Sequence, residues 1–267
     1  MFKRLLCIAT VLVCIIAATK AFPAGNAQPS EIVNVVELDS YKDAIAGLTT
    51  EDRDVVTIMF NLFLKQYGEA IPLLKQIATR HSNDAAAWYL LAFSFNRSGS
   101  WQEAYDAAAA SMRLQPDAAA PYKERGMASV QLGRYAEAEK DLLFYLKTMN
   151  GDAAAHYYRG LALGLLGRLP EARVELNLAR IYNPNLAILT NYYIALIDSK
   201  QGRFKEALKP LREISKAFEG TDNNFTQSLP KLIGQIQKAE ANKEKVSAVG
   251  KAIFEMDVKN APAYLQR

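Results

Sequence analysis

The sequence predicts an all-α protein built from stacked helical hairpins, and an internal repeat of about 34 residues is the first observation behind this prediction. Glycines recur at Gly99, Gly133, Gly167 and Gly202, at equal steps except for one extra residue in the last. An apolar or aromatic residue two places later and an alanine five places later keep the same steps, at Trp101, Tyr135, Leu169, Phe204, Ala104, Ala138, Ala172 and Ala207. A repeat of this length indicates stacked units, none of which can bury its apolar face alone.

Residues 85–118 show what one unit contains. Trp88, Leu91, Ala92 and Phe95 are spaced i, i+3, i+4 and i+7, which places them on one face of a helix. The turn-forming residues 96–100 interrupt this pattern, and a second, alanine-rich helix is predicted over Trp101–Leu114. Pro116 follows this helix, and proline cannot continue it. Each unit is therefore predicted to be an antiparallel helical hairpin.

With these motifs the chain resembles the tetratricopeptide repeat family, in its exported bacterial type. The family pattern is met best by residues 85–118, at Trp88, Leu91, Ala92, Phe95, Gly99, Trp101, Ala104 and Pro116. The resemblance implies a right-handed superhelical solenoid of about five hairpins with C-terminal capping helices. It covers about three-quarters of the chain that remains after a signal peptide is removed.

The repeat limits follow from the period. The predicted units are 51–84, 85–118, 119–152, 153–186 and 187–220. The first is recognised by Tyr67-Gly68-Glu69-Ala70, which lies one repeat length before the equivalent motif at 101–104. Residues 22–50 are expected to be extended or partly ordered. Residues 221–267 are predicted to form capping helices, the first starting beside Ser228 and the second containing Val246, Val249, Ile253 and Met256.

The positions of four prolines bear on the predicted helix limits. Pro121 and Pro170 fall in the first turns of predicted helices, where a missing N–H is tolerated. Pro72 and Pro210 fall inside predicted second helices, so a kink or a late start is expected there.

The N-terminus has the features of a secretory signal peptide. Lys3 and Arg4 precede an uncharged stretch from Leu5 to Ala18, which is shorter than the roughly 20 residues of a membrane span. Small residues favour cleavage after residue 21 or, as the alternative, after residue 27; an uncleaved anchor is the competing interpretation. Cleavage leaves no cysteine and no membrane span, and periplasmic localisation is expected.

Charge and composition exclude several function classes. Removing Lys3, Arg4 and Lys20 leaves 29 basic against 28 acidic residues, a balance without the clustered basic face that nucleic-acid binding requires. The two histidines, His81 and His156, are far apart in sequence, and no spacing predicts a metal or cofactor site. His156 occupies the aromatic position of its repeat and is interpreted as a packing residue. We therefore expect a non-enzymatic protein.

Two repeats carry a matched pair of charges. Arg125 is followed by Asp141 and, at the same separation, Arg159 is followed by Glu175. In the preceding repeat the equivalent positions hold Leu91 and Ala107. This covariation predicts an ion pair between the two helices of a hairpin. Anion binding by the arginines is the alternative interpretation.

The resemblance further implies that the first helices of the repeats line a concave groove. The residues expected to face it are Tyr89, Phe93, Asn96, Lys123, Met127, Val130, Tyr157, Leu161, Gly164, Asn191, Ala195 and Asp198. This set is aromatic and apolar rather than basic, which suits a protein partner. The alternatives are that some of these side chains pack between repeats, or that the N-terminal segment or a capping helix fills the groove.

The function expected from these features is a protein–protein interaction scaffold of the cell envelope. It would bind a partner peptide or helix in the groove, for assembly or export of an envelope complex. The alternative is a self-assembling module that forms a homodimer through its C-terminal helices.

Overall fold

The structure, a computed structural model, describes residues 50–221 and 224–242, and every regular element in these ranges is a helix. The helices are α4 (Thr50–Phe63), α5 (Tyr67–Arg80), α6 (Ala85–Ser98), α7 (Trp101–Leu114), α8 (Ala119–Gln131), α9 (Tyr135–Leu146), α10 (Ala153–Leu165), α11 (Leu169–Tyr182), the 3₁₀ turn η2 (Pro184–Leu186), α12 (Ala187–Lys200), α13 (Phe204–Ala217) and α14 (Asn224–Asn242). The predicted all-α class is confirmed.

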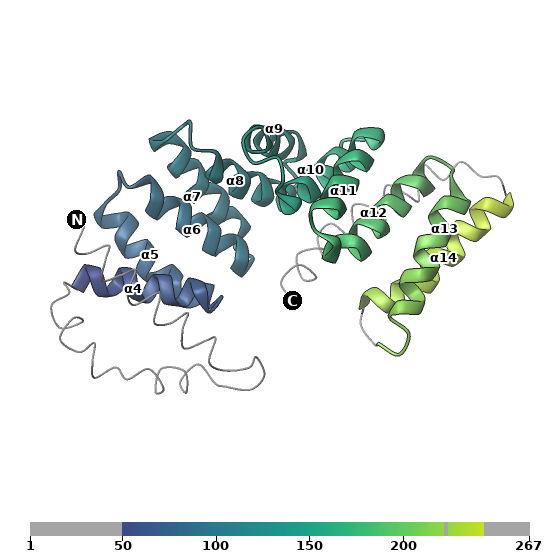
Figure 1. Cartoon of the computed structure of the whole chain (residues 1–267), viewed down its shortest axis with the longest axis horizontal. Helices are drawn as coiled ribbons and strands as arrows, with labels where there is room; N and C mark the ends of the chain where they lie inside the picture. The colour runs from purple at the N-terminus through teal and green to yellow at the C-terminus, as the bar shows by residue number, and fades with distance from the viewer. Residues whose placement is uncertain (1–49, 222–223, 243–267) are drawn as a thin grey trace. The chain divides into compact units, whose positions relative to one another are not determined.

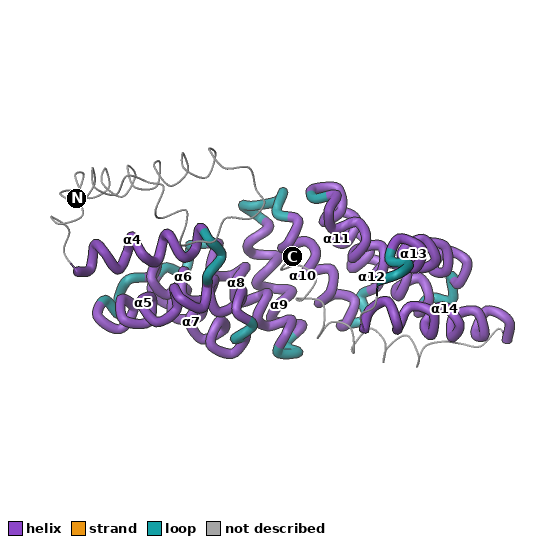
Figure 2. The backbone as a smooth tube through the Cα atoms, turned by 90° about the horizontal axis from the view of Figure 1, so that it is seen from below, coloured by secondary structure: helices purple, strands orange, loops and turns teal. Residues whose placement is uncertain are grey.

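The chain divides into two compact units, residues 1–80 and 81–267. In the first unit, α4 packs against α5. In the second, α6 packs with α7, α8 with α9, α10 with α11 and α12 with α13, and each hairpin contacts the next along the chain. Figure 1 labels this succession of helices from α6 to α14, and Figure 2 shows the short loops that join the two helices of a hairpin.

The repeated glycines close the hairpins. Gly99, Gly133, Gly167 and Gly202 all have positive φ values, between 76° and 81°. After each glycine the next N–H donates to a carbonyl five residues earlier, as Ser100 does to Phe95 at 2.9 Å. This bond ends the first helix and requires a left-handed residue, which glycine adopts without a steric penalty.

The first hairpin ends its first helix with a different residue. Lys65 occupies the position that Gly99 holds in the next repeat, and it has a φ of 59°. A residue with a Cβ atom is disfavoured in this conformation by roughly 1–2 kcal/mol. The turn geometry of the repeat therefore extends to α4 and α5 even where glycine is missing.

Glycine also sets how closely helices approach within two hairpins. A Cβ atom added to Gly126 would lie 2.7 Å from Leu142 Cγ, and one added to Gly160 would lie 2.9 Å from Leu176 Cγ. The equivalent positions of the α6–α7 hairpin hold two completely buried alanines, Ala92 and Ala108. Glycine is thus matched with leucine and alanine with alanine, so the large side chain lies opposite the position that lacks a Cβ atom.

Two sequence predictions about helix limits are wrong. Of the two outcomes expected for Pro72 and Pro210, the late start is wrong, because α5 begins at Tyr67 and α13 at Phe204, with each proline inside the helix; the kink stays a prediction. The first capping helix, α14, begins at Asn224, before Ser228. Pro121 and Pro170 lie in first turns as predicted.

Several predictions fall outside the described residues: the signal peptide and its two cleavage sites, the segment 22–49 and the second capping helix with Val246 and Met256. Among the described helices, none has the combination of length and apolar character that a membrane span requires.

Candidate functional site

The predicted groove residues fall into two groups by exposure. Tyr89, Phe93, Lys123 and Asn191 are partly exposed. The others are buried, namely Asn96, Met127, Val130, Tyr157, Leu161, Gly164, Ala195 and Asp198. A buried side chain offers no surface to a partner in this conformation, so the candidate surface is narrower than the sequence suggests.

Tyr157 shows how the buried group is packed. Its side chain is completely buried and its ring packs edge-on against Tyr158 at 5.3 Å and Tyr193 at 5.9 Å between centroids. Burial raises the pKa of Tyr158 to about 12. Tyr157, Leu161 and Ala195 belong to the continuous apolar core that runs from α8 to α14. These residues match the packing alternative rather than an open surface.

Two of the four partly exposed residues, Tyr89 and Phe93, lie on α6. Tyr89 and Phe93 are one turn apart, and Arg97, one turn further, places its guanidinium 4.5 Å from the centre of the Phe93 ring. Burial, together with the nearby Glu124 carboxylate, raises the pKa of Tyr89. Arg97 was missed from the sequence, although its i, i+4, i+8 spacing with the two aromatic residues was available.

A buried amide and carboxylate hold this helix against α8. Asn96 Nδ2 donates to the Glu124 carboxylate at 2.7 Å and to the Glu124 carbonyl at 2.8 Å. Glu124 is only 2% exposed, and Arg97 Nη1 approaches its carboxylate at 3.9 Å. The predicted partner residue Asn96 is thus a structural link between α6 and α8.

Lys123, the basic residue predicted for the groove, is paired within the chain. Its Nζ lies 2.6 Å from Oδ2 of Asp152, which also accepts from the Tyr145 hydroxyl at 2.8 Å, while Asp152 Oδ1 accepts from the Ala155 N–H at 3.0 Å. Burial alone would raise the pKa of Asp152, but these three donors lower it below its ordinary value. Asp152 caps α10, so this cluster ties α8 to the start of the next hairpin.

Asp198 and Asn191 are also engaged by arginines. The Asp198 carboxylate accepts from Arg173 and from Arg203, and Asn191 Oδ1 accepts from Arg180 Nη1 at 2.8 Å. Two of these arginines come from α11, so the contacts hold α11 against α12. The Asp198 carboxylate and the Asn191 amide oxygen are therefore both bound within the chain.

The two predicted ion pairs within hairpins are present. Arg125 binds Asp141 through two hydrogen bonds of 2.7 and 2.8 Å, and Arg159 Nη1 lies 2.5 Å from Glu175 Oε1. Their existence supports the structural interpretation over anion binding. Bidentate pairs such as that of Arg125 fix geometry as well as charge.

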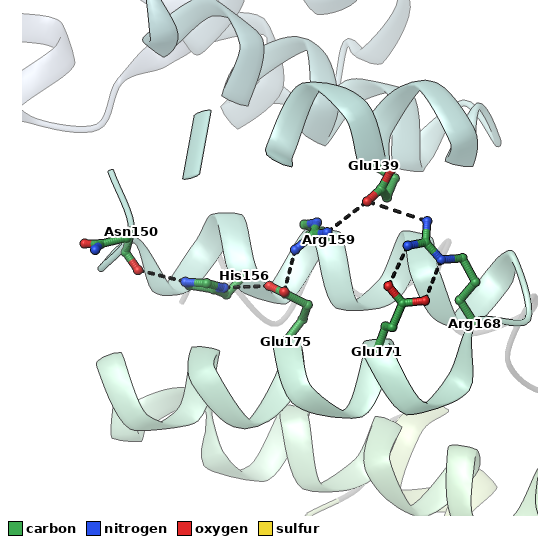
Figure 3. Close-up of polar contacts among 7 residues, drawn as sticks. All are labelled: Glu139, Asn150, His156, Arg159, Arg168, Glu171 and Glu175. Atoms are coloured by element: carbon green, nitrogen blue, oxygen red, sulfur yellow. Dashed lines mark hydrogen bonds and ion pairs between the residues drawn. The ribbon is translucent and has the colours of Figure 1, made fainter. Parts of the chain in front are cut away.

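The second pair is part of a larger network, shown in Figure 3. Arg159 Nη2 also lies 2.9 Å from Glu139 of α9, and Arg168 approaches the same carboxylate at 3.6 Å. The network therefore joins two consecutive hairpins. Glu139 was not predicted because it lies outside the regular spacing that identified the pairs.

His156 completes this network and explains a feature shared by three repeats. Trp88 Nε1 donates to the Ser82 carbonyl at 3.0 Å, and the Tyr122 hydroxyl donates to the Pro116 carbonyl at 2.9 Å. His156 Nε2 lies 2.8 Å from the Asn150 carbonyl, again six residues earlier. The rings of Trp88, Tyr122 and His156 thus make equivalent hydrogen bonds, each to the loop that precedes its own hairpin.

The other ring nitrogen of His156 faces an acid. Nδ1 lies 2.6 Å from Glu175 Oε2, and the ring stacks on Tyr182. Because a carbonyl oxygen only accepts, Nε2 carries a proton, and protonation of the ring lets Nδ1 donate to the carboxylate. Burial alone would lower the pKa of His156, but the Glu175 carboxylate and the Asn150 carbonyl outweigh it and raise the pKa above 6.5.

This raised pKa predicts a pH-dependent contribution to stability. Because the pKa of His156 is higher in the folded than in the unfolded protein, its protonation stabilises the folded state. This contribution is complete below the unfolded pKa of about 6.5 and is lost as the pH rises through the folded pKa. Replacing His156 by tyrosine should therefore destabilise more at pH 5.5 than at pH 8.5, measured by urea unfolding. Tyr122→Phe removes the equivalent loop bond without an imidazole, and its effect should be the same at both pH values. Equal effects of His156→Tyr at both pH values would contradict the prediction.

The network does not form a catalytic arrangement in the described part of the chain. Both His156 nitrogens are engaged and its side chain is buried, so it offers no base to a substrate. Across residues 50–221 and 224–242, no group of three or more His, Cys, Asp or Glu side chains could hold a metal ion.

Comparisons with known proteins agree with this architecture. The tetratricopeptide repeat family model matches residues 62–123 and 123–185. Among solved structures, MamA of strain MSR-1 is 20% identical, with a TM-score of 0.55 over 64% of this chain and 98% of that chain. MamA from Desulfovibrio magneticus RS-1 is 18% identical, with a TM-score of 0.55 over 65% and 97%. MamA of strain AMB-1 is 22% identical, with a TM-score of 0.53 over 62% and 95%.

At these identities the structural matches concern the fold alone. No curated protein sequence matches the chain significantly. The family match, the helical hairpins and the glycine turns agree on one conclusion. The chain is a tetratricopeptide repeat protein.

Proposed function

We propose that this protein is an interaction scaffold of the cell envelope that binds a partner peptide or helix on the first helices of its second unit. The tetratricopeptide repeat fold supports a protein-binding scaffold in general. The observation that carries the specific proposal is the row Tyr89, Phe93 and Arg97 on α6, defined here as the anchor row.

The anchor row has the chemistry of a binding hot spot. Tyrosine and arginine are enriched where truncation weakens an interface most, and aromatic rings give a large contact area at a small entropic cost. All three side chains are partly buried, so less of their freedom is lost when a partner covers them. Their i, i+4, i+8 spacing presents a strip along one helix face, which suits an apolar peptide or helix.

The N-terminal sequence supports the envelope location. Lys3 and Arg4 before an uncharged stretch favour export, and the protein would then act in the periplasm. A fusion to a reporter that is active only outside the cytoplasm tests this part; an inactive fusion would contradict it. Dimerisation through residues 221–267 remains a separate prediction, tested by whether their removal lowers the mass in light scattering.

The partner-binding surface is tested with a photoreactive residue at Tyr89 in cells. We expect a crosslink to one defined envelope protein, reduced at least about tenfold by Phe93→Ala because hot-spot truncations cost about 2 kcal/mol or more. Leu143→Ala on α9 is the matched control, since Leu143 is 38% exposed and lies outside the anchor row. If Leu143→Ala reduced the crosslink as much as Phe93→Ala does, or if no crosslink formed, the proposal would be contradicted.

A further inference from the structure

The second helix of the last hairpin carries an exposed row of positive charge. Lys205, Lys209, Arg212 and Lys216 are spaced by 4, 3 and 4 residues, which places them on one face of α13. All four side chains are exposed, and none has an ion-pair partner among the described residues. We call these four residues the basic row.

The arrangement is unfavourable for an isolated helix. Lys205 and Lys209 are like charges at i, i+4, as are Arg212 and Lys216, and such pairs repel. Glu206 and Glu213 lie on the flank of the row, three or four residues from Lys209, and offset part of this repulsion, but the face along the row itself carries only positive charges. For solubility alone, positive and negative side chains interspersed along this face would be more favourable.

Two hollows beside the basic row suit a segment of polypeptide rather than a flat anionic surface. One, of about 390 Å³, is lined by Lys205, Lys209 and Arg212 together with Leu208, Glu213 and Glu240. The other, of about 450 Å³, has Arg212 and Lys216 at its edge and the apolar side chains of Phe218, Leu229 and Ile233 in its lining. Acidic side chains can meet the row while a neighbouring apolar side chain enters the hollow lined by Phe218, Leu229 and Ile233.

The chain itself contains a segment with this composition. Residues 31–43 include four acids, Glu31, Glu37, Asp39 and Asp43, against one base, and the apolar residues Ile32, Val33, Val35, Val36 and Leu38 lie between them. The basic row spans eleven helical steps, about 17 Å. The six steps from Glu37 to Asp43 span about 20 Å when extended, a comparable length.

We propose that residues 31–43 of one copy bind the basic row on α13 of a second copy. The two surfaces are different parts of the chain, so the contact is heterologous, and assembly continues beyond a dimer unless a ring closes. This contact lies on a different helix from the anchor row, and it does not depend on the partner proposed above.

The test is the mass of the purified chain by light scattering over a range of concentrations. We expect species larger than a dimer that grow with concentration and dissociate when salt rises from about 50 to about 500 mM, because exposed charges are screened. Lys205→Glu with Lys209→Glu should abolish the species larger than a dimer at every concentration, and so should Glu37→Lys with Asp39→Lys. Combining all four substitutions restores opposite charges across the contact and should restore the assembly.

The matched control is Lys140→Glu with Lys147→Glu, which changes the net charge equally at two exposed positions of the α8–α9 hairpin. This variant should assemble as the unsubstituted chain does. Equal dissociation of the control, a failed restoration in the four-fold variant or a chain that is monomeric at all concentrations would each overturn the proposal. The Tyr89 crosslink should persist in the Lys205→Glu, Lys209→Glu variant, so the two proposals fail separately.

Discussion

Replacing Arg159 by leucine is expected to lower the free energy of unfolding by about 3 kcal/mol, because it leaves buried carboxylates without their main partner. Arg159 is 14% exposed and bridges Glu175, which is 10% exposed, and Glu139, which is 11% exposed. Urea unfolding of the purified chain measures the change. Arg168→Leu is the control within the same network, and it should have little effect because Arg168 is 43% exposed.

A second variant tests the Arg159 prediction with the residues that another repeat has at the same positions. In the α6–α7 hairpin the positions of Arg159 and Glu175 hold Leu91 and Ala107, both buried. Arg159→Leu combined with Glu175→Ala should therefore recover at least half of the lost stability, because an apolar pair can replace a buried ion pair. If the double variant were less stable than Arg159→Leu alone, the charge-pair explanation would be wrong.

Gly160→Ala is expected to destabilise the protein by about 1–2 kcal/mol, because overpacking outweighs the gain in helix propensity. The added Cβ atom would meet Leu176 Cγ at 2.9 Å and the Ala172 carbonyl oxygen at 3.3 Å. Overpacking of this kind costs about 1–3 kcal/mol, against a gain of at most about 1 kcal/mol in propensity. Gly234→Ala in α14 is the control, since nothing lies within 4 Å of its added Cβ atom, and it should be neutral or stabilising. Urea unfolding of both variants measures the difference.

The matching of glycine with leucine predicts coupling between the two positions. Leu176→Ala alone should lower stability by about 2–5 kcal/mol. Together, Gly160→Ala and Leu176→Ala reproduce the Ala92 and Ala108 arrangement, so their combined effect should be smaller than the sum. A double-mutant cycle in urea measures this difference. Strictly additive losses would show that the two positions do not share one packing space.

The fold could be predicted from the sequence because its period marks a backbone requirement. Gly99 and its equivalents hold left-handed φ values, and few other residues do so readily. The ion pairs of Arg125 and Arg159 were predictable for a related reason. A change from leucine to arginine in the first helix of a repeat was accompanied by a change from alanine to an acid in the second helix.

The exposure of the candidate surface could not be predicted from the sequence. Helical spacing gives the face on which Tyr157 or Leu161 lies, but not how closely neighbouring helices cover that face. Glu139 joins Arg159 from the preceding hairpin, and this contact depends on how one repeat stacks on the next. Arg97 was not predicted because the family's groove positions are one, five and eight residues after the aromatic slot, whereas the anchor row continues to the ninth.

The left-handed turn at Lys65 has a consequence for local opening. In a solenoid, stability is close to a sum over single repeats and their interfaces, so an end repeat can open while the others remain folded. Lys65 holds a conformation that costs roughly 1–2 kcal/mol, whereas the later hairpins use glycine at this place. Local unfolding of the α4–α5 hairpin should therefore cost less free energy than that of a hairpin with glycine at this turn. Its amide hydrogens are expected to be among the earliest to exchange with solvent.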